Sequence, residues 1–127
     1  MGREQRSWTW FARFWLPVLA YVGIIFALSA QPNLQPPFRF QNSDKFAHLA
    51  EYFGLGVLLV RALRATDSLS DAVRGGLVAL LIGMSIGASD ELFQSTVPGR
   101  ESSVRDFAAD CGGLVVAQLA YLLIRRE

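Results

Sequence analysis

Hydrophobic residues along the chain gather in four long segments, and polar or charged residues separate these segments. The segments cover about residues 8–30, 44–63, 74–97 and 106–124. A helix needs about 20 mainly apolar residues to cross the hydrocarbon core of a bilayer, and each segment is near that length. Charged residues, Pro or Gly bound the segments, as they commonly do at helix ends. The pattern predicts an all-α integral membrane protein, a bundle of four transmembrane helices in a single domain over residues 1–127.

The connectors between the segments contain residues that form turns. Residues 31–43 are rich in Pro and amide side chains, and Asn42 or Ser43 can cap the second helix. Residues 66–70 form a polar connector, and Pro98 and Gly99 end the third segment. We interpret these stretches as loops within one domain.

The amino-acid composition agrees with a membrane environment and excludes some classes of function. Hydrophobic residues make up 52% of the chain and charged residues 18%, which is too apolar for most soluble domains of this size. Lys plus Arg total 12 and Asp plus Glu total 11, so we expect no nucleic-acid partner. Cys111 is the only cysteine, which excludes an intrachain disulfide and a Cys-rich metal site.

The uneven distribution of basic residues predicts the orientation, because cytoplasmic loops retain positive charge. Eight basic residues lie on the side of the two termini: Arg3, Arg6, Arg13, Arg61, Arg64, Arg74, Arg125 and Arg126. Four lie on the other side: Arg39, Lys45, Arg100 and Arg105. We therefore expect both termini to be cytoplasmic.

The first segment has two interpretations. Trp8, Trp10 and Trp15 gather at its start, as in the aromatic belt of a membrane-spanning helix. Alternatively, small residues at 27–30 could be the cleavage site of a secretory signal. The apolar run exceeds the roughly 7–15 residues of a signal sequence, and three further spans follow it. We therefore expect the first helix to be retained.

Ionisable side chains within the segments lie near one end of the expected helices. A charged group at the centre of a bilayer costs on the order of 3 kcal/mol, so each one requires a partner, a cavity or a function. In the second segment Asp44, His48, Glu51 and Tyr52 lie at offsets of four, seven and eight residues. This spacing places them on one broad helix face over the first two turns.

Small residues and carboxylates share faces of the other two helices. In the third segment they recur at every fourth position: Ala79, Gly83, Gly87 and Glu91, with Asp90 and Gln94 nearby. In the fourth they are spaced four, three and four apart: Asp106, Asp110, Gly113 and Ala117. Small residues let membrane helices approach closely. We therefore expect the third and fourth helices to pack through Gly83, Gly87, Gly113 and Ala117, with the carboxylates facing inward.

Three helices thus bring polar side chains to a similar depth near the exterior membrane surface. We predict that they share an outward-facing pocket with these binding residues: Asp44, Lys45, His48, Tyr52, Glu91, Gln94, Arg100 and Asp106. One alternative is a buried ion-pair network that fixes the register of the helices and binds nothing.

Two motifs resemble the VanZ-like family of bacterial membrane proteins. They are Asp44-Lys45-Phe-Ala-His48-Leu-Ala-Glu-Tyr52 and Glu91-Leu-Phe-Gln94, followed by Pro98-Gly99-Arg100 and Asp106. The resemblance covers the chain from the second segment to its end. It implies a small helical protein of the bacterial cytoplasmic membrane, with a family link to lowered susceptibility to the glycopeptide teicoplanin and no settled biochemical activity. Asp110 departs from the family pattern, which has Asn at this position.

Two classes of function fit these residues. In the preferred one, Lys45, Arg100 and protonated His48 contact the phosphate of an anionic lipid or of a lipid-linked cell-envelope precursor. The alternative is a membrane enzyme, a hydrolase or transferase acting on a lipid-linked phosphate. His48 or a carboxylate would then be the acid or base, and four carboxylates would be candidate metal ligands: Glu51, Glu91, Asp106 and Asp110. The sequence has no phosphate-binding Gly loop or nucleophile elbow to strengthen the alternative.

Overall fold

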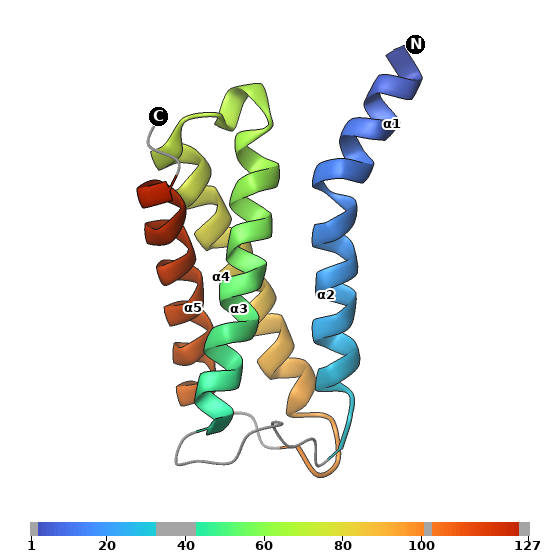
Figure 1. Cartoon of the computed structure of the whole chain (residues 1–127). Helices are drawn as coiled ribbons and strands as arrows, with labels where there is room; N and C mark the ends of the chain where they lie inside the picture. Colours follow the sequence, from blue (N-terminus) through green and yellow to red (C-terminus); the bar gives the residue numbers. More distant parts are fainter. Residues whose placement is uncertain (1–2, 33–42, 101–102, 125–127) are drawn as a thin grey trace.

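The computed structural model describes residues 3–32, 43–100 and 103–124 (Figure 1). The elements in chain order are α1 (Arg3–Phe14), α2 (Leu16–Ser29), α3 (Ser43–Arg64), the short 3-10 helix η1 (Asp67–Leu69), α4 (Ala72–Gln94) and α5 (Val104–Ile124). Four stretches are long and apolar enough to cross a membrane: Ser7–Ser29, Ser43–Arg64, Ala72–Gln94 and Val104–Ile124. The four predicted spans are therefore confirmed, although the third ends at Gln94 rather than at residue 97.

Together α1 and α2 make the first span, which is interrupted at Trp15. Pro17 lacks an N–H group, so the carbonyl of Arg13 four residues earlier has no helical donor. Arg61 of α3 donates a hydrogen bond to this carbonyl at 2.9 Å, and its guanidinium lies 4.8 Å from the centre of the Phe14 ring. The neighbouring helix thus satisfies the backbone acceptor that the proline leaves free.

The most extensive helix contact joins α3 and α5, and small residues make it close. A Cβ on Gly113 would lie 2.2 Å from the carbonyl oxygen of Leu49 and 2.8 Å from the backbone nitrogen of Phe53. A Cβ on Gly56 would lie 2.7 Å from the Cβ of Ala117. The expectation that Gly113 and Ala117 pack on the third span is therefore wrong. They pack on α3, because the backbone of α3 comes close to α5 at Leu49 and Phe53 and again at Gly56.

The small residues of α4 face the bundle interior, as predicted. Ala79, Gly83 and Gly87 are all buried. A Cβ on Gly83 would lie 2.5 Å from a methyl carbon of Leu114 on α5. A Cβ on Gly87 would lie 3.4 Å from the ring of Tyr52 on α3. This stripe therefore serves packing within one chain.

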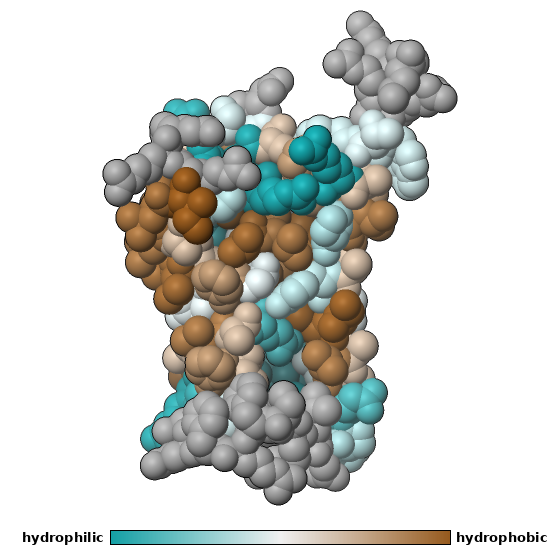
Figure 2. Space-filling view, in the orientation of Figure 1, coloured by the Kyte–Doolittle hydropathy of each residue, from teal (hydrophilic) through white to brown (hydrophobic). Residues whose placement is uncertain are grey.

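The outer surface of the bundle is apolar. Figure 2 shows hydrophobic side chains on the flanks of the middle of the molecule, with hydrophilic ones gathered near its two ends. Leu77 and Leu81 of α4 and Leu119 and Leu123 of α5 are among the exposed large side chains. Such a surface suits contact with lipid chains.

Candidate functional site: a buried polar cluster

Four helix ends meet at the end of the bundle opposite the start of α1 and the end of α5 (Figure 1). They are the ends of α2 and α4 and the starts of α3 and α5. Six polar side chains are buried in this region: Ser29, Asp90, Glu91, Gln94, Asp106 and Asp110. Together with Lys45, His48 and Tyr52, which are hydrogen-bonded to them, they form what we call the polar cluster. Asp106 lies in the first turn of α5, where the positive end of the helix dipole stabilises a carboxylate.

One part of the polar cluster is a hydrogen-bond network around Asp90 that joins three helices. Asp90 of α4 accepts hydrogen bonds from the hydroxyl groups of Ser29 on α2 and Tyr52 on α3, the latter at 2.9 Å. Gln94 donates to the hydroxyl of Ser29 at 3.1 Å. Asp90 and Tyr52 are 1% and 0% exposed. Because these hydrogen bonds link side chains of α2, α3 and α4, we interpret the network as a structural element that holds the three helices together.

Neither Ser29 nor Asp90 was among the site residues predicted from the sequence. A signal for Asp90 was present, because Gly83, Gly87, Asp90 and Gln94 are spaced four, three and four residues apart. This spacing defines one helix face, and all four residues are buried. The burial of both Asp90 and Glu91 shows that the inward face of α4 is broader than the four-residue period indicated.

Lys45 forms the second part of the polar cluster, as an ion pair between α3 and α5. Its ammonium group donates to Asp106 at 2.6 Å and to Asp44 at 2.5 Å. The Asp106 side chain is 8% exposed, whereas those of Lys45 and Asp44 are 30% and 55% exposed. An ammonium has three donors, so Lys45 has one further donor beyond these two carboxylates.

His48 and two carboxylates form the third part. The Nδ1 atom of His48 lies 2.8 Å from Oδ1 of Asp110, whose side chain is fully buried. Glu91 accepts a hydrogen bond from the backbone nitrogen of Ser103 at 3.2 Å through Oε2. Within the described residues, Glu91 Oε1 and Asp110 Oδ2 are buried without a hydrogen-bond partner. One ligand atom each from His48, Glu91 and Asp110 lie within 4.8 Å of one another.

Ser103 also fixes the start of α5, and so links the helix to Glu91. Its hydroxyl accepts a hydrogen bond from the backbone nitrogen of Asp106 at 3.1 Å, the arrangement of a helix N-cap. Its own backbone nitrogen donates to Glu91. Glu91 of α4 therefore holds the first turn of α5 in place.

Arg100 lies on the turn that leads toward α5. The Arg100 backbone nitrogen donates to the Val97 carbonyl at 3.2 Å, and Gly99 has a φ of 82°. Pro at the second position and a positive φ at the third are typical of a type II turn. The Arg100 side chain makes a long hydrogen bond of 3.5 Å to the Gln31 carbonyl. Its guanidinium is thus held near the end of α2, and it is only half-buried.

The structure thus divides the predicted site residues into separate groups. Glu91, His48 and Asp110 come together, Lys45 pairs with Asp44 and Asp106, and Tyr52 and Gln94 belong to the Asp90 network. Of the four predicted metal candidates, Glu91 and Asp110 lie together with His48. Asp106 pairs with Lys45 instead, and Glu51 is outside the group. The backbone carbonyl of Glu51 accepts a hydrogen bond from Tyr21 at 2.5 Å.

A hollow of about 460 Å³ lies beside Glu91, between the end of α4 and the start of α5. Its walls are mainly apolar and include Leu92, Val104 and Phe107, and Glu91 and Ser103 supply its polar part. The polar cluster therefore contacts this apolar-walled space through Glu91. Such a combination suits a molecule with both an alkyl part and a polar part.

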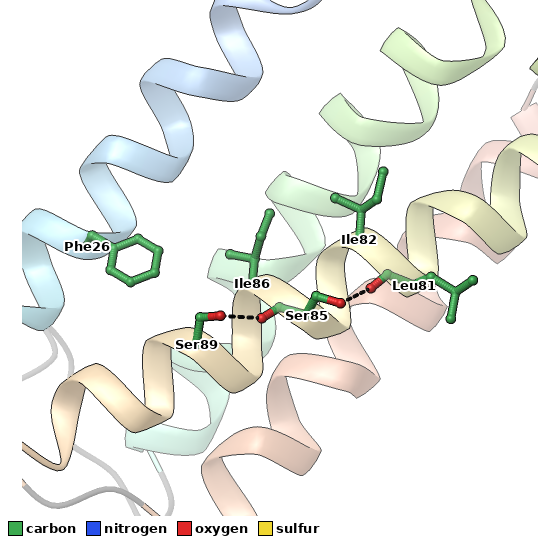
Figure 3. Close-up of a pocket in the computed structure, with 6 residues that line it drawn as sticks. All are labelled: Phe26, Leu81, Ile82, Ser85, Ile86 and Ser89. Carbon is green, nitrogen blue, oxygen red and sulfur yellow. Dashed lines mark hydrogen bonds between the residues drawn. The ribbon is translucent and has the colours of Figure 1, made fainter.

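A second hollow, of about 470 Å³, lies between α2 and α4 and is shown in Figure 3. Phe26 faces it from α2, and α4 contributes the other lining residues (Figure 3). The hydroxyl groups of Ser85 and Ser89 each donate at 2.8 Å to a backbone carbonyl one turn earlier in α4. This groove therefore offers mainly apolar surface, and none of its described lining residues is charged.

The family model named VanZ/LLP1 matches residues 6–125, nearly the entire chain. The chain belongs to the VanZ/LLP1 family. The match includes the first span, whereas the resemblance noted from the motifs began at the second. With four helices able to span a bilayer, this VanZ/LLP1 chain is a multi-pass membrane protein. Comparison with curated proteins and with solved structures gave no match.

Proposed function

We propose that this VanZ/LLP1 protein binds the head group of an anionic lipid, or of a lipid-linked cell-envelope precursor, at the polar cluster. The observation that carries the proposal is the contact between the buried polar cluster and the apolar-walled hollow beside Glu91. An alkyl chain would lie against Leu92, Val104 and Phe107, and its head group would lie over the cluster.

The exposure of the charged groups supports a phosphate-bearing head group. Lys45 and Arg100 are half-buried and Arg105 is exposed, whereas Asp106 and Asp110 are buried. Arginine and lysine at the surface would contact the phosphate oxygens first. Among the described residues Lys45 uses two of its three donors, and the hydrogen bond of Arg100 is long, so both groups can bind an anion.

The proposal also includes the membrane surface at which the lipid binds and the consequence for the cell. With both termini in the cytoplasm, the polar cluster lies at the outer surface of the bacterial cytoplasmic membrane. Envelope precursors carried on lipid are available at that surface. Binding them would change the amount or the accessibility of the target of a glycopeptide such as teicoplanin.

A second candidate function is a membrane enzyme that acts on a lipid-linked phosphate. The observation that favours it is the hydrogen bond between His48 and the buried Asp110, since a carboxylate commonly orients a histidine that acts as general base. Release of inorganic phosphate from a lipid phosphate by purified protein, lost in His48→Gln, would support this candidate over binding alone.

Native mass spectrometry of protein extracted from its own membrane tests the proposed binding. We expect a bound phosphate-containing lipid in the wild type. Arg100→Ala should weaken its binding by about tenfold or more, because a charge-assisted hydrogen bond contributes about 1.5–3 kcal/mol. Arg74→Ala, at the opposite end of the bundle, is the matched control and should retain the lipid. Equal lipid occupancy in all three proteins would contradict the proposal.

A further inference from the structure

We infer that His48, Glu91 and Asp110 bind one divalent transition-metal cation, of the class of Zn²⁺ or Mn²⁺. The three residues come from α3, α4 and α5, so the site exists only when these helices are packed together. Its ligand atoms lie within 4.8 Å of one another. A cation with bonds of about 2.0–2.2 Å keeps its ligand atoms roughly 3–4 Å apart, a difference that small side-chain rotations can close.

Unpartnered oxygen atoms point to a cation rather than to a closed hydrogen-bond network. Glu91 is 9% exposed and Asp110 is 0% exposed. Within the described part of the chain, one carboxylate oxygen of each is buried and has no hydrogen-bond donor. A buried carboxylate oxygen without a donor costs about 1–3 kcal/mol or more. Asp90 nearby accepts two hydrogen bonds. The other buried oxygen without a partner among the described residues is Gln118 Oε1, which lies elsewhere on α5.

The balance of charge supports the same inference. Asp106 is paired with Lys45, and within the described residues His48 is the side chain hydrogen-bonded to Asp110. Even a protonated His48 neutralises only one of the two carboxylates in the group. A divalent cation bound by a neutral imidazole and two carboxylates would be neutral overall, which suits a site inside a bundle.

The donor set selects the class of cation. Imidazole suits zinc and other first-row transition metals, whereas Mg²⁺ and Ca²⁺ prefer oxygen ligands alone. Three protein ligands leave at least one coordination position for an outside molecule. Glu91 also lines the hollow between α4 and α5, so the open position has a route to the surface.

The cation would deepen the proposed function, and this step rests on that function. A phosphate oxygen would complete the coordination of the metal, with Lys45 and Arg100 beside it. The cation would thereby allow an anionic head group to bind next to buried carboxylates that would otherwise repel it.

Metal titration of purified protein in detergent tests the inference without any lipid. The protein is stripped with a chelator and titrated calorimetrically with ZnCl₂ and with MnCl₂. We expect one ion per chain for at least one metal, with affinity at least about 100-fold lower in Glu91→Gln and Asp110→Asn, because loss of even an outer partner costs 10–100-fold. Glu51→Gln, a carboxylate on α3 outside the group, is the matched control and should change affinity less than about threefold. No binding of either metal to folded wild type, or equal affinity in Glu91→Gln and wild type, would overturn the inference.

X-ray absorption spectroscopy of the metal-loaded wild type gives a second test, which needs no variant and so cannot fail because a variant misfolds. We expect one imidazole nitrogen and carboxylate oxygens around the metal. A metal coordination sphere without imidazole, or with sulfur from Cys111, would overturn the inference. If the metal binds but no phosphate-containing lipid does, the site stands and the proposed function fails. If the lipid binds equally with and without metal, the proposed function stands and the bridging role fails.

Discussion

His48 on α3 and Asp110 on α5 lie 2.8 Å apart, from Nδ1 to Oδ1, in the interface between these two helices. The pair occupies the same end of the interface as Lys45 and Asp106. The two pairs lie three residues apart on α3 and four residues apart on α5, and they bridge the two helices that share the most extensive contact. This relationship gives Asp110 a definite partner.

Asp110→Asn tests what the charge of this residue contributes. The amide oxygen can still accept a hydrogen bond from His48, so we expect the free energy of unfolding to change by less than about 1 kcal/mol. Asp110→Ala removes the acceptor and should cost about 1–3 kcal/mol. Reversible unfolding in mixed detergent measures both. Equal losses in the two variants would show that the hydrogen bond to His48 does not matter for stability.

Gly113→Ala tests the close packing of α3 and α5. The added methyl group would lie 2.2 Å from the Leu49 carbonyl oxygen, so the helices must move apart. We expect a loss of about 1–3 kcal/mol of stability, as for other overpacked sites. Gly112→Ala is the matched control, because its methyl group would lie 3.9 Å from the nearest side-chain atom, on Leu49. A smaller loss in Gly113→Ala than in Gly112→Ala would contradict the assigned interface.

The fold was largely predictable from the sequence, because each helix that crosses a membrane needs a long apolar segment. The sequence shows four such segments. Which neighbouring helix each helix face contacts was predictable only in part. The stripe of Ala79, Gly83 and Gly87 pointed inward as expected, but Gly113 and Ala117 contact α3 instead of α4. A small-residue stripe says that a helix approaches a neighbour closely, and does not say which neighbour.

The candidate site was predictable as a set of residues but not as a set of pairs. Periodicity placed His48, Glu91 and Asp106 at one end of the bundle. It could not show that Asp106 would pair with Lys45 while Asp110 paired with His48. Those choices depend on the rotation of α5 against α3, which the contact at Gly113 sets. Ser29 escaped prediction because a single serine in an apolar helix is usually bonded to its own backbone.

The orientation in the membrane is a further prediction, from eight basic residues on one side and four on the other. Reporter fusions at the C-terminus and in the connector of residues 31–43 measure it. We expect a cytoplasmic reporter, such as green fluorescent protein, to be active at the C-terminus. We expect a periplasmic reporter, such as alkaline phosphatase, to be active in the connector. The opposite pattern would place the polar cluster at the cytoplasmic surface.

The central claim is that the polar cluster is a binding site and not a device that fixes helix register. Glu91→Gln separates these two roles most directly when folding and lipid occupancy are measured on the same purified sample. A register network loses stability when one of its charges is removed. In a binding site, the same substitution replaces a buried carboxylate whose oxygen has no donor. The protein should then lose its ligand but keep or gain stability.

We predict that the free energy of unfolding of Glu91→Gln is within about 1 kcal/mol of the wild-type value or higher than it, because the substitution removes a buried charge. We predict that native mass spectrometry of the same sample finds the phosphate-containing lipid lost. A variant that is destabilised by about 3 kcal/mol or more while it keeps the lipid at wild-type occupancy would contradict the account.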